Sequence, residues 1–472
     1  MSIQGGSNRI SSDARRAIAV DNPLLWSVAA RLEYPAKDQG GRPNSYPLWV
    51  FFIWIILIHE YGSSRIVEEA LSDIEYGPWP AIRDAAIREF GGDRPDLIPP
   101  PSPPTRNQFN YALKWHLTDN IDVVADDVRR NSQLLASEMG LGTDEAPGSL
   151  ARPSVERVAF GDVTVMTART KILRDDARHV DRDTGEVVYR RHDEDAARHT
   201  TGGGAVVPGL PFAFTHVRGR RRNEHVILAV DPVTPKGPSE GHLVVDQYLR
   251  AADQLSGLVG FAYDRALRGQ HLDRLLKAGH IGLVGTYKRK GRASNRFHGI
   301  ETHHPRSGAP RDIEIQLVGG APHVRKFDVN GHAHLTPLHR RRINKRVNKR
   351  DGQVRLSAEY DVTNAAGEVD GYVRIRLYQT AEDQLTRYNR PEHLRAFPEG
   401  DPIFEQIQKP LRASAESANR TIDDHHPRER LHHFGFMKNT LSMLAWQVYR
   451  NSQTQAVFAP HPRLDRPLAE AG

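Results

Sequence analysis

The chain has 472 residues, with 65 Lys or Arg against 58 Asp or Glu, and no cysteine. This length exceeds one ordinary hydrophobic core and indicates two or three domains. The lack of cysteine excludes disulfides and thiolate metal sites and is consistent with a cytoplasmic protein. The polar start MSIQGGSNRISSDARR lacks the apolar segment of a signal peptide, so we expect the protein to stay inside the cell.

Residues 1–150 are predicted to form a helical region that binds DNA ends or mediates dimerisation. Its apolar run, Pro47–Ile58, has 12 residues, fewer than the roughly 20 that a membrane-spanning helix needs. We therefore expect a buried helix and no membrane partner. A helical scaffold without DNA contact is the alternative.

Two further helices are predicted in this region. Thr105 and Gln108 have the spacing of a capping box at the start of TRNQFNYALKWHL. A second helix is predicted from about Asn120 to Met139, with Gly140 at its end. A turn-rich linker, Gly142–Pro153, follows.

Residues 151–286 are predicted to form the first part of a catalytic core. The apolar patterns give three strands, a helix, a strand, a helix and a strand, which is the order of a ribonuclease-H-like mixed sheet flanked by helices. DTGE, within the charged excursion Arg174–Gly204, predicts a hairpin. The fold class expected is α/β.

The remainder of the chain divides into three parts. Residues 287–385 alternate polar and apolar positions and predict a mostly β insertion. Residues 386–455 are predicted to complete the core with a helix that carries Glu416, and residues 456–472 to form a loose tail.

Three acids are the candidate catalytic and metal-binding residues. Two short apolar runs each end in an aspartate, Asp162 within VAFGDVTVM and Asp264 within LVGFAYDRA, and Glu416 follows on the later helix. Three carboxylates from separate elements can hold two Mg²⁺ (or Mn²⁺) ions about 4 Å apart. This layout predicts a two-metal phosphoryl-transfer enzyme, although a single aspartate at a strand end is often a turn residue.

The helix of Glu416 adds two candidate catalytic arginines. Arg412 and Arg420 lie one turn before and one turn after Glu416, with Asn419 beside them, so we expect the acid to be held between two guanidiniums. They either orient the carboxylate and contact the scissile phosphate or serve as structural ion-pair partners. Asp423, seven positions later, is the alternative third acid.

Three stretches, FGDVTVMTA, GFAYDRALRGQHLDRLL and RASAESANRTIDDHHPRERLHHFG, resemble the bacterial insertion-sequence transposases with a DDE catalytic triad. With their connections they cover about residues 155–450. Of the signature Tyr-x-x-Arg-x-x-x-Glu-x-x-x-x-x-x-Lys, Arg412 and Glu416 match, whereas Lys409 and Asp423 occupy the other two positions.

The resemblance implies DNA cleavage and strand transfer at the ends of a mobile element by Asp162, Asp264 and Glu416 with two metal ions. It also implies a homodimer that binds double-stranded DNA, both terminal inverted repeats and target, and is associated with the nucleoid when bound. The alternatives are a metal-dependent nuclease of the same fold and a domesticated DNA-binding protein that no longer transposes.

Basic side chains concentrate in one part of the chain. Between Lys288 and Arg350 there are 16 Lys or Arg against four acids, although the whole chain carries a net charge of only +7. Such a stretch favours a polyanion partner, here DNA, with a solvated surface or RNA binding as alternatives. The DNA-contact candidates are Arg220, Arg221, Arg222, Lys288, Arg289, Lys290, Arg340, Arg341, Arg342, Lys345, Arg346, Lys349 and Arg350.

Histidines occur as adjacent pairs, among them His425 with His426 and His432 with His433. Neighbouring residues on a helix point about 100° apart, so neither pair forms a chelate on one face. We therefore expect no zinc site from these pairs.

Overall fold

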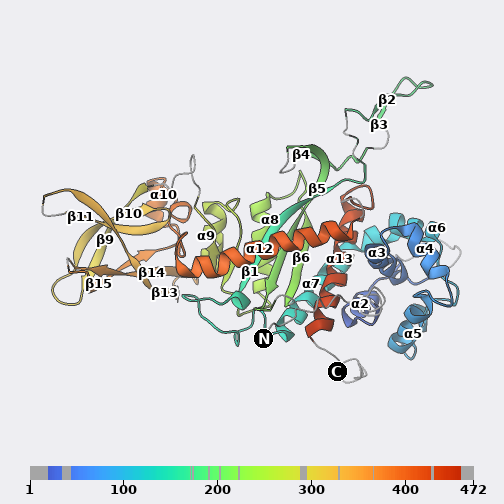
Figure 1. Cartoon of the computed structure of the whole chain (residues 1–472), viewed down its shortest axis with the longest axis horizontal. Helices are drawn as coiled ribbons and strands as arrows, with labels where there is room; N and C mark the ends of the chain where they lie inside the picture. Colours follow the sequence, from blue (N-terminus) through green and yellow to red (C-terminus); the bar gives the residue numbers. More distant parts are fainter. Residues whose placement is uncertain are drawn as a thin grey trace, which may run out of the picture.

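In the computed structural model, three regions follow one another along the long axis of the chain (Figure 1). Helices from the N-terminal part gather at one end, a mixed sheet with flanking helices lies in the middle, and a lobe of antiparallel strands forms the other end. The structure describes residues 20–34, 44–170, 172, 175–189, 192–200, 204–221, 224–286, 295–327, 330–364, 366–426 and 430–458, apart from the side chains of residues 295 and 423–425. The mixed α/β class agrees with the sequence pattern.

The helical region is built around one apolar helix. The helices are α2 (Pro23–Ala29), α3 (Trp49–Tyr61), α4 (Ser64–Ser72), α5 (Trp79–Phe90), α6 (Arg106–Ala112) and α7 (Ile121–Glu138). Helix α3 contains the apolar run, and its residues from Trp49 to His59 are all buried. This helix is apolar on all sides and not amphipathic, because the other helices pack around it. Within the described residues, no single helix combines the length and apolar composition needed to cross a membrane.

Local signals set the ends of several helices. Thr105 and Gln108 form the expected capping box at the start of α6, where the Gln108 side chain accepts from the Thr105 N–H at 2.8 Å. The predicted helix changes character after Ala112, since Leu113–Leu117 form a π-helical turn. Helix α7 is followed by Gly140, whose φ of 72° suits glycine.

The central sheet has the spatial order β6–β5–β1–β7–β8. Its strands are β1 (Val158–Thr167), β5 (Val206–Arg218), β6 (His225–Pro232), β7 (Gly260–Ala262) and β8 (Ile281–Leu283). β1 pairs antiparallel with β5 and parallel with β7, β5 pairs antiparallel with β6, and β7 pairs parallel with β8. A further short strand, β4 (Ala197–Thr200), pairs with β5, and the predicted hairpin is β2 (Arg178–Val180) with β3 (Val187–Tyr189).

Helices cover both faces of this sheet. Helices α8 (Glu240–Ala252) and α9 (Gly269–Ala278) connect β6 to β7 and β7 to β8, and they pack with Ala159 and Phe261 on one face. The long helix α12 (Pro402–His425) crosses the opposite face, where its Leu411 and Ala415 share a core with Val158 and Phe160. Figure 1 shows α12 running from the β lobe across the sheet toward the helical region.

The β lobe lies between β8 and α12 in the sequence, as predicted for the insertion. Its seven-stranded sheet has the order β12–β11–β10–β9–β15–β14–β13, and every pairing is antiparallel. The strands are β9 (Asn295–Pro305), β10 (Arg311–Val318), β11 (Ala321–Phe327), β12 (Ala333–Pro337), β13 (His339–Val347), β14 (Val354–Thr363) and β15 (Val369–Arg376). Two short helices, α10 (Ala381–Leu385) and α11 (Arg390–His393), lead back to α12.

The last helix, α13 (Phe436–Phe458), joins the helical region to the central sheet. Its Leu444 and Tyr449 belong to the core around α3, whereas its Met443 and Trp446 pack against the sheet. Helix α7 also contacts both α13 and β6. The helical region and the sheet therefore share two helices and pack as one body. Helix α13 extends to Phe458, beyond the start of the stretch expected as a tail, and residues 459–472 lie outside the described part.

Candidate active site

The two candidate aspartates come from adjacent parallel strands. Asp162 lies in the middle of β1, not at the end of a short strand as its apolar run predicts, because β1 continues to Thr167. Asp264 follows the end of β7 by two residues. Phe160 and Ala262 are direct partners in the β1–β7 register and belong to the core beneath α12. Asp162 and Asp264 each follow one of these partners by two positions, so the strand period of two brings both toward the α12 face.

Asn419 on α12 reaches Asp162 directly. Its Nδ2 donates to the Asp162 Oδ2 at 2.9 Å, while the Val163 N–H donates to the other carboxylate oxygen at 3.0 Å. The Asp264 carboxylate is held by a backbone group of its own loop, because its Oδ1 accepts from the Ala266 N–H at 2.7 Å. Both carboxylates are therefore oriented by the chain itself.

Glu416 lies between the two residues of α12 that act on Asp162. It is one turn after Arg412 and three residues before Asn419, and these spacings put all three on one side of the helix. The Arg412 Nε lies 3.4 Å from the Glu416 Oε1, and the Glu416 side chain is 63% exposed. Glu416 therefore lies on the same side of α12 as Asn419 and is accessible to solvent.

Arg420 does not complete the expected clamp. It is exposed, and among the described side chains it makes no ion pair with Glu416, so only Arg412 holds the acid. The side chain of Asp423, the alternative third acid, lies outside the described part of the chain.

The electrostatics show that these groups share one environment. Burial raises the pKa of Asp162, the positive charge of Arg412 lowers it, and the negative charge of Asp264 raises it again. The hydrogen bond from Asn419 opposes the net rise. Two carboxylates that repel each other while a cation and an amide stabilise them form a site suited to a divalent cation.

Glu240, the first residue of α8, is a fourth carboxylate that no sequence pattern indicated. It accepts from the Tyr263 hydroxyl at 2.8 Å. Burial raises the pKa of Glu240, and the charges of Asp264 and Asp162 raise it further. An acid in the first turn of a helix is common because it complements the helix dipole, so the sequence offers no signal that marks this one.

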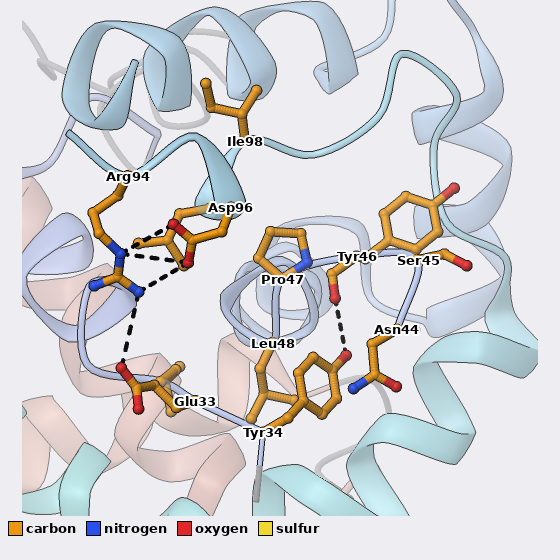
Figure 2. Close-up of a pocket in the computed structure, with 12 residues that line it drawn as sticks. Glu33, Tyr34, Asn44, Ser45, Tyr46, Pro47, Leu48, Arg94, Asp96 and Ile98 are labelled. Atoms are coloured by element: carbon orange, nitrogen blue, oxygen red, sulfur yellow. Dashed lines mark hydrogen bonds and ion pairs between the residues drawn. The ribbon is translucent and has the colours of Figure 1, made fainter. Parts of the chain in front are cut away.

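A cavity in the described structure lies away from these acids. It measures about 370 Å³ and is lined by residues of the helical region, as Figure 2 shows. Arg94 there is paired with Asp96 at 3.0 Å and lies 3.8 Å from Glu33, and the Tyr34 hydroxyl donates to the Tyr46 carbonyl at 3.0 Å. Its arginine is paired with the two acids that line it, and the cavity contains none of the candidate acids.

Most of the basic candidates on and after β13 are exposed to solvent. Arg341, Lys345, Arg346, Lys349 and Arg350 all have solvent-accessible side chains. Together they present a positively charged strand and turn at the edge of the β lobe sheet. This is the part of the basic stretch that is open to a polyanion.

Arg340 is a correction to the predicted set, because its side chain is 9% exposed and faces inward. It lies 2.9 Å from Asp401 and covers the ring of Phe397 at 4.1 Å. Its role in this structure is to bind the β lobe to the start of α12.

Arg342 is also committed within the lobe. It forms two hydrogen bonds, of 2.5 and 3.1 Å, with Glu359, which Arg374 bonds as well. Although burial raises the pKa of Glu359, these bonds lower it to about 2. The charge of Arg342 therefore balances a buried acid.

The remaining basic candidates lie partly outside the described residues. Arg220 and Arg221 occupy the β5–β6 turn, where they pair with Glu156 at 2.8 Å and Glu224 at 3.6 Å. Arg222, Lys288, Arg289 and Lys290 lie outside the described part.

The site therefore combines Asp162, Asp264 and Glu240 with the positive charge of Arg412, and Glu416 pairs with Arg412 on α12. Carboxylate oxygens are the ligands that Mg²⁺ and Mn²⁺ prefer. Such a set can bind divalent cations and, through them, phosphate oxygens. Neither the models of known protein families nor the curated proteins contain a match to this chain.

Proposed function

We propose that this chain is a transposase of the DDE type, in which Asp162, Asp264 and Glu416 bind two Mg²⁺ or Mn²⁺ ions and act on the ends of a mobile DNA element. One observation carries the proposal. Two aspartates 102 positions apart in the sequence, one on β1 and one just after its parallel partner β7, lie under a helix whose Asn419 bonds the first of them and whose Glu416 lies one turn from Asn419.

The order of the sheet supports the same interpretation. Three strands in antiparallel pairing precede a helix, a parallel strand, a second helix and a second parallel strand. We interpret this arrangement as ribonuclease-H-like, with β4 as an addition at β5 and the β lobe inserted before α12.

The ions, when bound, would activate a nucleophilic oxygen and neutralise charge on the leaving one. The chain's own residues supply the rest of the site. Asp162 and Asp264 are fixed by hydrogen bonds, so they provide ligands with little reorganisation. Glu416 is exposed on α12, where it can turn toward the aspartates when cations remove the repulsion among the acids. Arg412 pairs with Glu416, and its positive charge also acts on Asp162, so its guanidinium can contact a phosphate oxygen bound at this site.

The reaction proposed has two steps that use the same acids. In the first, water attacks the phosphodiester at the element's end, and the product is a free 3′-hydroxyl and a 5′-phosphate. In the second, that 3′-hydroxyl attacks a target phosphodiester, which forms a new bond and releases a 3′-hydroxyl of the target. A homodimer would hold the two ends, and the exposed residues of β13 would contact phosphates of either DNA.

The experiment uses duplexes made from the DNA that flanks the gene, in which a mobile element would carry terminal inverted repeats. Mg²⁺-dependent cleavage and joining to a plasmid are measured for the wild type and for Asp162→Ala, Asp264→Ala and Glu416→Ala. We expect each variant to lose both activities and to retain DNA binding. Asp253→Ala is the matched control, because this exposed acid lies just after the opposite end of α8, roughly 20 Å from Glu240.

The outcomes separate the alternatives. Cleavage without joining would identify a nuclease, and end-specific binding without either activity would identify a domesticated DNA-binding protein. Asp423→Ala and Glu240→Gln are tested beside Glu416→Ala, and wild-type activity in Glu416→Ala with loss in one of the others would move the third acid. Retained cleavage in both aspartate variants would refute the proposal.

The helical region is proposed to recognise the ends. It exposes Trp115 by 52%, with the Lys114 Nζ 4.2 Å from its ring centroid, on the π-helical turn after α6. Because α7 and α13 bind this region to the sheet, point changes test it better than deletion of residues 1–140. Footprinting of Lys114→Ala with Trp115→Ala should show weakened protection of the ends, and unchanged protection would place recognition in the β lobe.

A further inference from the structure

Three histidines from distant parts of the sequence meet in the interior. His59 lies in α3, His426 directly follows α12, and His432 lies in the segment before α13. His59 and His426 are buried, at 3% and 1% exposure, and His432 is partly buried. One ring nitrogen from each lies within 4.8 Å of those from the other two. The cluster takes one histidine from each of two adjacent pairs and a third from α3, so the geometry of a single pair does not reveal it.

Hydrogen bonds to backbone carbonyls fix the orientation of two of these rings. The Nε2 of His59 lies 2.9 Å from the Ser442 carbonyl, and the Nδ1 of His426 lies 2.8 Å from the Ile422 carbonyl. A carbonyl oxygen only accepts, so these nitrogens carry the protons. The lone pairs are then on Nδ1 of His59 and Nε2 of His426. Histidine ligands of metals commonly donate their second N–H to a carbonyl in this way.

We propose that His59, His426 and His432 bind one Zn²⁺ ion. Two imidazole nitrogens on a tetrahedral zinc lie about 3.4 Å apart, given Zn–N bonds of about 2.0–2.1 Å, so modest ring rotations from the observed positions suffice. Three neutral imidazoles with no thiolate and no carboxylate in the set favour zinc among common cellular metals, and they would not hold Mg²⁺, which prefers oxygen. Burial and the neighbouring His426 and His433 lower the pKa of His432, which keeps it in the neutral form that binds metals.

The position of this ion would make it a structural clip. It would join α3 of the helical region to the segment that follows α12, the helix that carries Glu416. The ring centroid of His426 is 5.2 Å from those of both His59 and His432, so a single ion reaches all three without moving the helices apart. This site is separate from the proposed active site and does not depend on the proposed function.

The test uses the untagged full-length chain, because a polyhistidine tag would bind the same metals. Zinc content is measured after dialysis, and Zn²⁺ affinity by competition with a chromogenic chelator. We expect about one zinc per chain and, with Co²⁺, the visible absorption of a tetrahedral nitrogen-bound ion. Removal of a residue that hydrogen-bonds a metal ligand costs about 10–100-fold in metal affinity. His432→Gln removes a ligand itself, so its Zn²⁺ affinity should fall by at least about 100-fold.

The control is His433→Gln. This residue is adjacent in sequence and partly buried near the cluster, but lies outside the group of three. It should keep zinc, the cobalt spectrum and the increase in melting temperature that Zn²⁺ gives the wild type. If His432→Gln fails to fold, His59→Gln and the wild-type cobalt spectrum decide the question.

Three results would overturn the assignment. The first is a wild-type chain with no cobalt spectrum and no stabilisation by Zn²⁺. The second is equal zinc affinity in His432→Gln and the wild type. The third is loss of zinc in His433→Gln alone. Because every readout is metal binding or stability, failure here would leave the proposed DNA chemistry untouched.

Discussion

Replacement of Asn419 by alanine tests whether α12 holds Asp162 ready for a metal ion. The Asn419 Nδ2 donates to the Asp162 Oδ2 at 2.9 Å, and the Asp162 carboxylate is partly buried. A hydrogen bond to a charged group contributes about 1.5–3 kcal/mol. Asp162 also keeps the Val163 N–H and the charge of Arg412, so the lower end of this range, about 1.5 kcal/mol, applies. Since about 1.4 kcal/mol is a factor of about ten, Mg²⁺ affinity should fall about tenfold.

The assay is a titration of DNA cleavage with Mg²⁺. The half-saturating concentration should rise about tenfold in Asn419→Ala, whereas cleavage at saturating Mg²⁺ should recover most of the wild-type rate. The defect should grow as the pH falls, because the missing bond opposes protonation of Asp162 in the wild type. Ser417→Ala is the control, since Ser417 is exposed on the same helix and about 200° around it from Asn419. Half-saturation within about twofold of the wild type would show that Asn419 does not support a metal ligand at Asp162.

Three further predictions concern charge and packing. Asp162→Asn should raise the melting temperature of the metal-free protein at neutral pH. Burial raises the pKa of Asp162 in the folded state, so the stability that this group contributes is present below its unfolded pKa of 3.8 and is lost as the pH rises through the folded pKa. A difference in melting temperature between variant and wild type that is unchanged at about pH 3 would contradict this. Trp446→Ala removes a side chain 1% exposed on α13 and should cost about 3–5 kcal/mol, in one cooperative urea transition because α13 joins two cores; two separated transitions would contradict the shared packing. The triple variant Arg341→Ala, Arg346→Ala and Lys349→Ala should bind DNA with a weaker salt dependence: the slope of log affinity against log salt should fall by up to about 0.9 for each phosphate that these side chains neutralise in the wild type. Arg340→Ala should lower stability instead. An unchanged salt slope in the triple variant would exclude β13 from the DNA-binding surface.

Local sequence signals determined much of the secondary structure of this protein. The capping box of Thr105 and Gln108 begins α6, and the DTGE turn forms the hairpin of β2 and β3. Alternating apolar positions produced the strands of the β lobe. These features depend on interactions between residues a few positions apart, so they can be predicted from short stretches of sequence. The same locality limits them, as the π-helical turn at Leu113–Leu117 shows: no short pattern distinguished it from a continued α-helix.

The candidate acids divide in the same way. Asp162, Asp264 and Glu416 follow apolar runs or a helical pattern and were therefore visible in the sequence. Glu240 was not, because an acid in a first helical turn is ordinary until folding buries it beside Asp162 and Asp264. Whether Glu416 is held by one arginine or two also depended on side-chain directions that spacing alone does not fix.

Only the tertiary structure decided which distant residues meet. The parallel pairing of β1 with β7 brings Asp162 and Asp264 to one face, and the return of the chain through α12 and α13 brings His426 and His432 to His59. Burial separates Arg340, which binds Asp401, from the exposed arginines of the same strand. Contacts of this kind arise from the packing of apolar faces across hundreds of residues, and the sequence encodes the faces but not their partners.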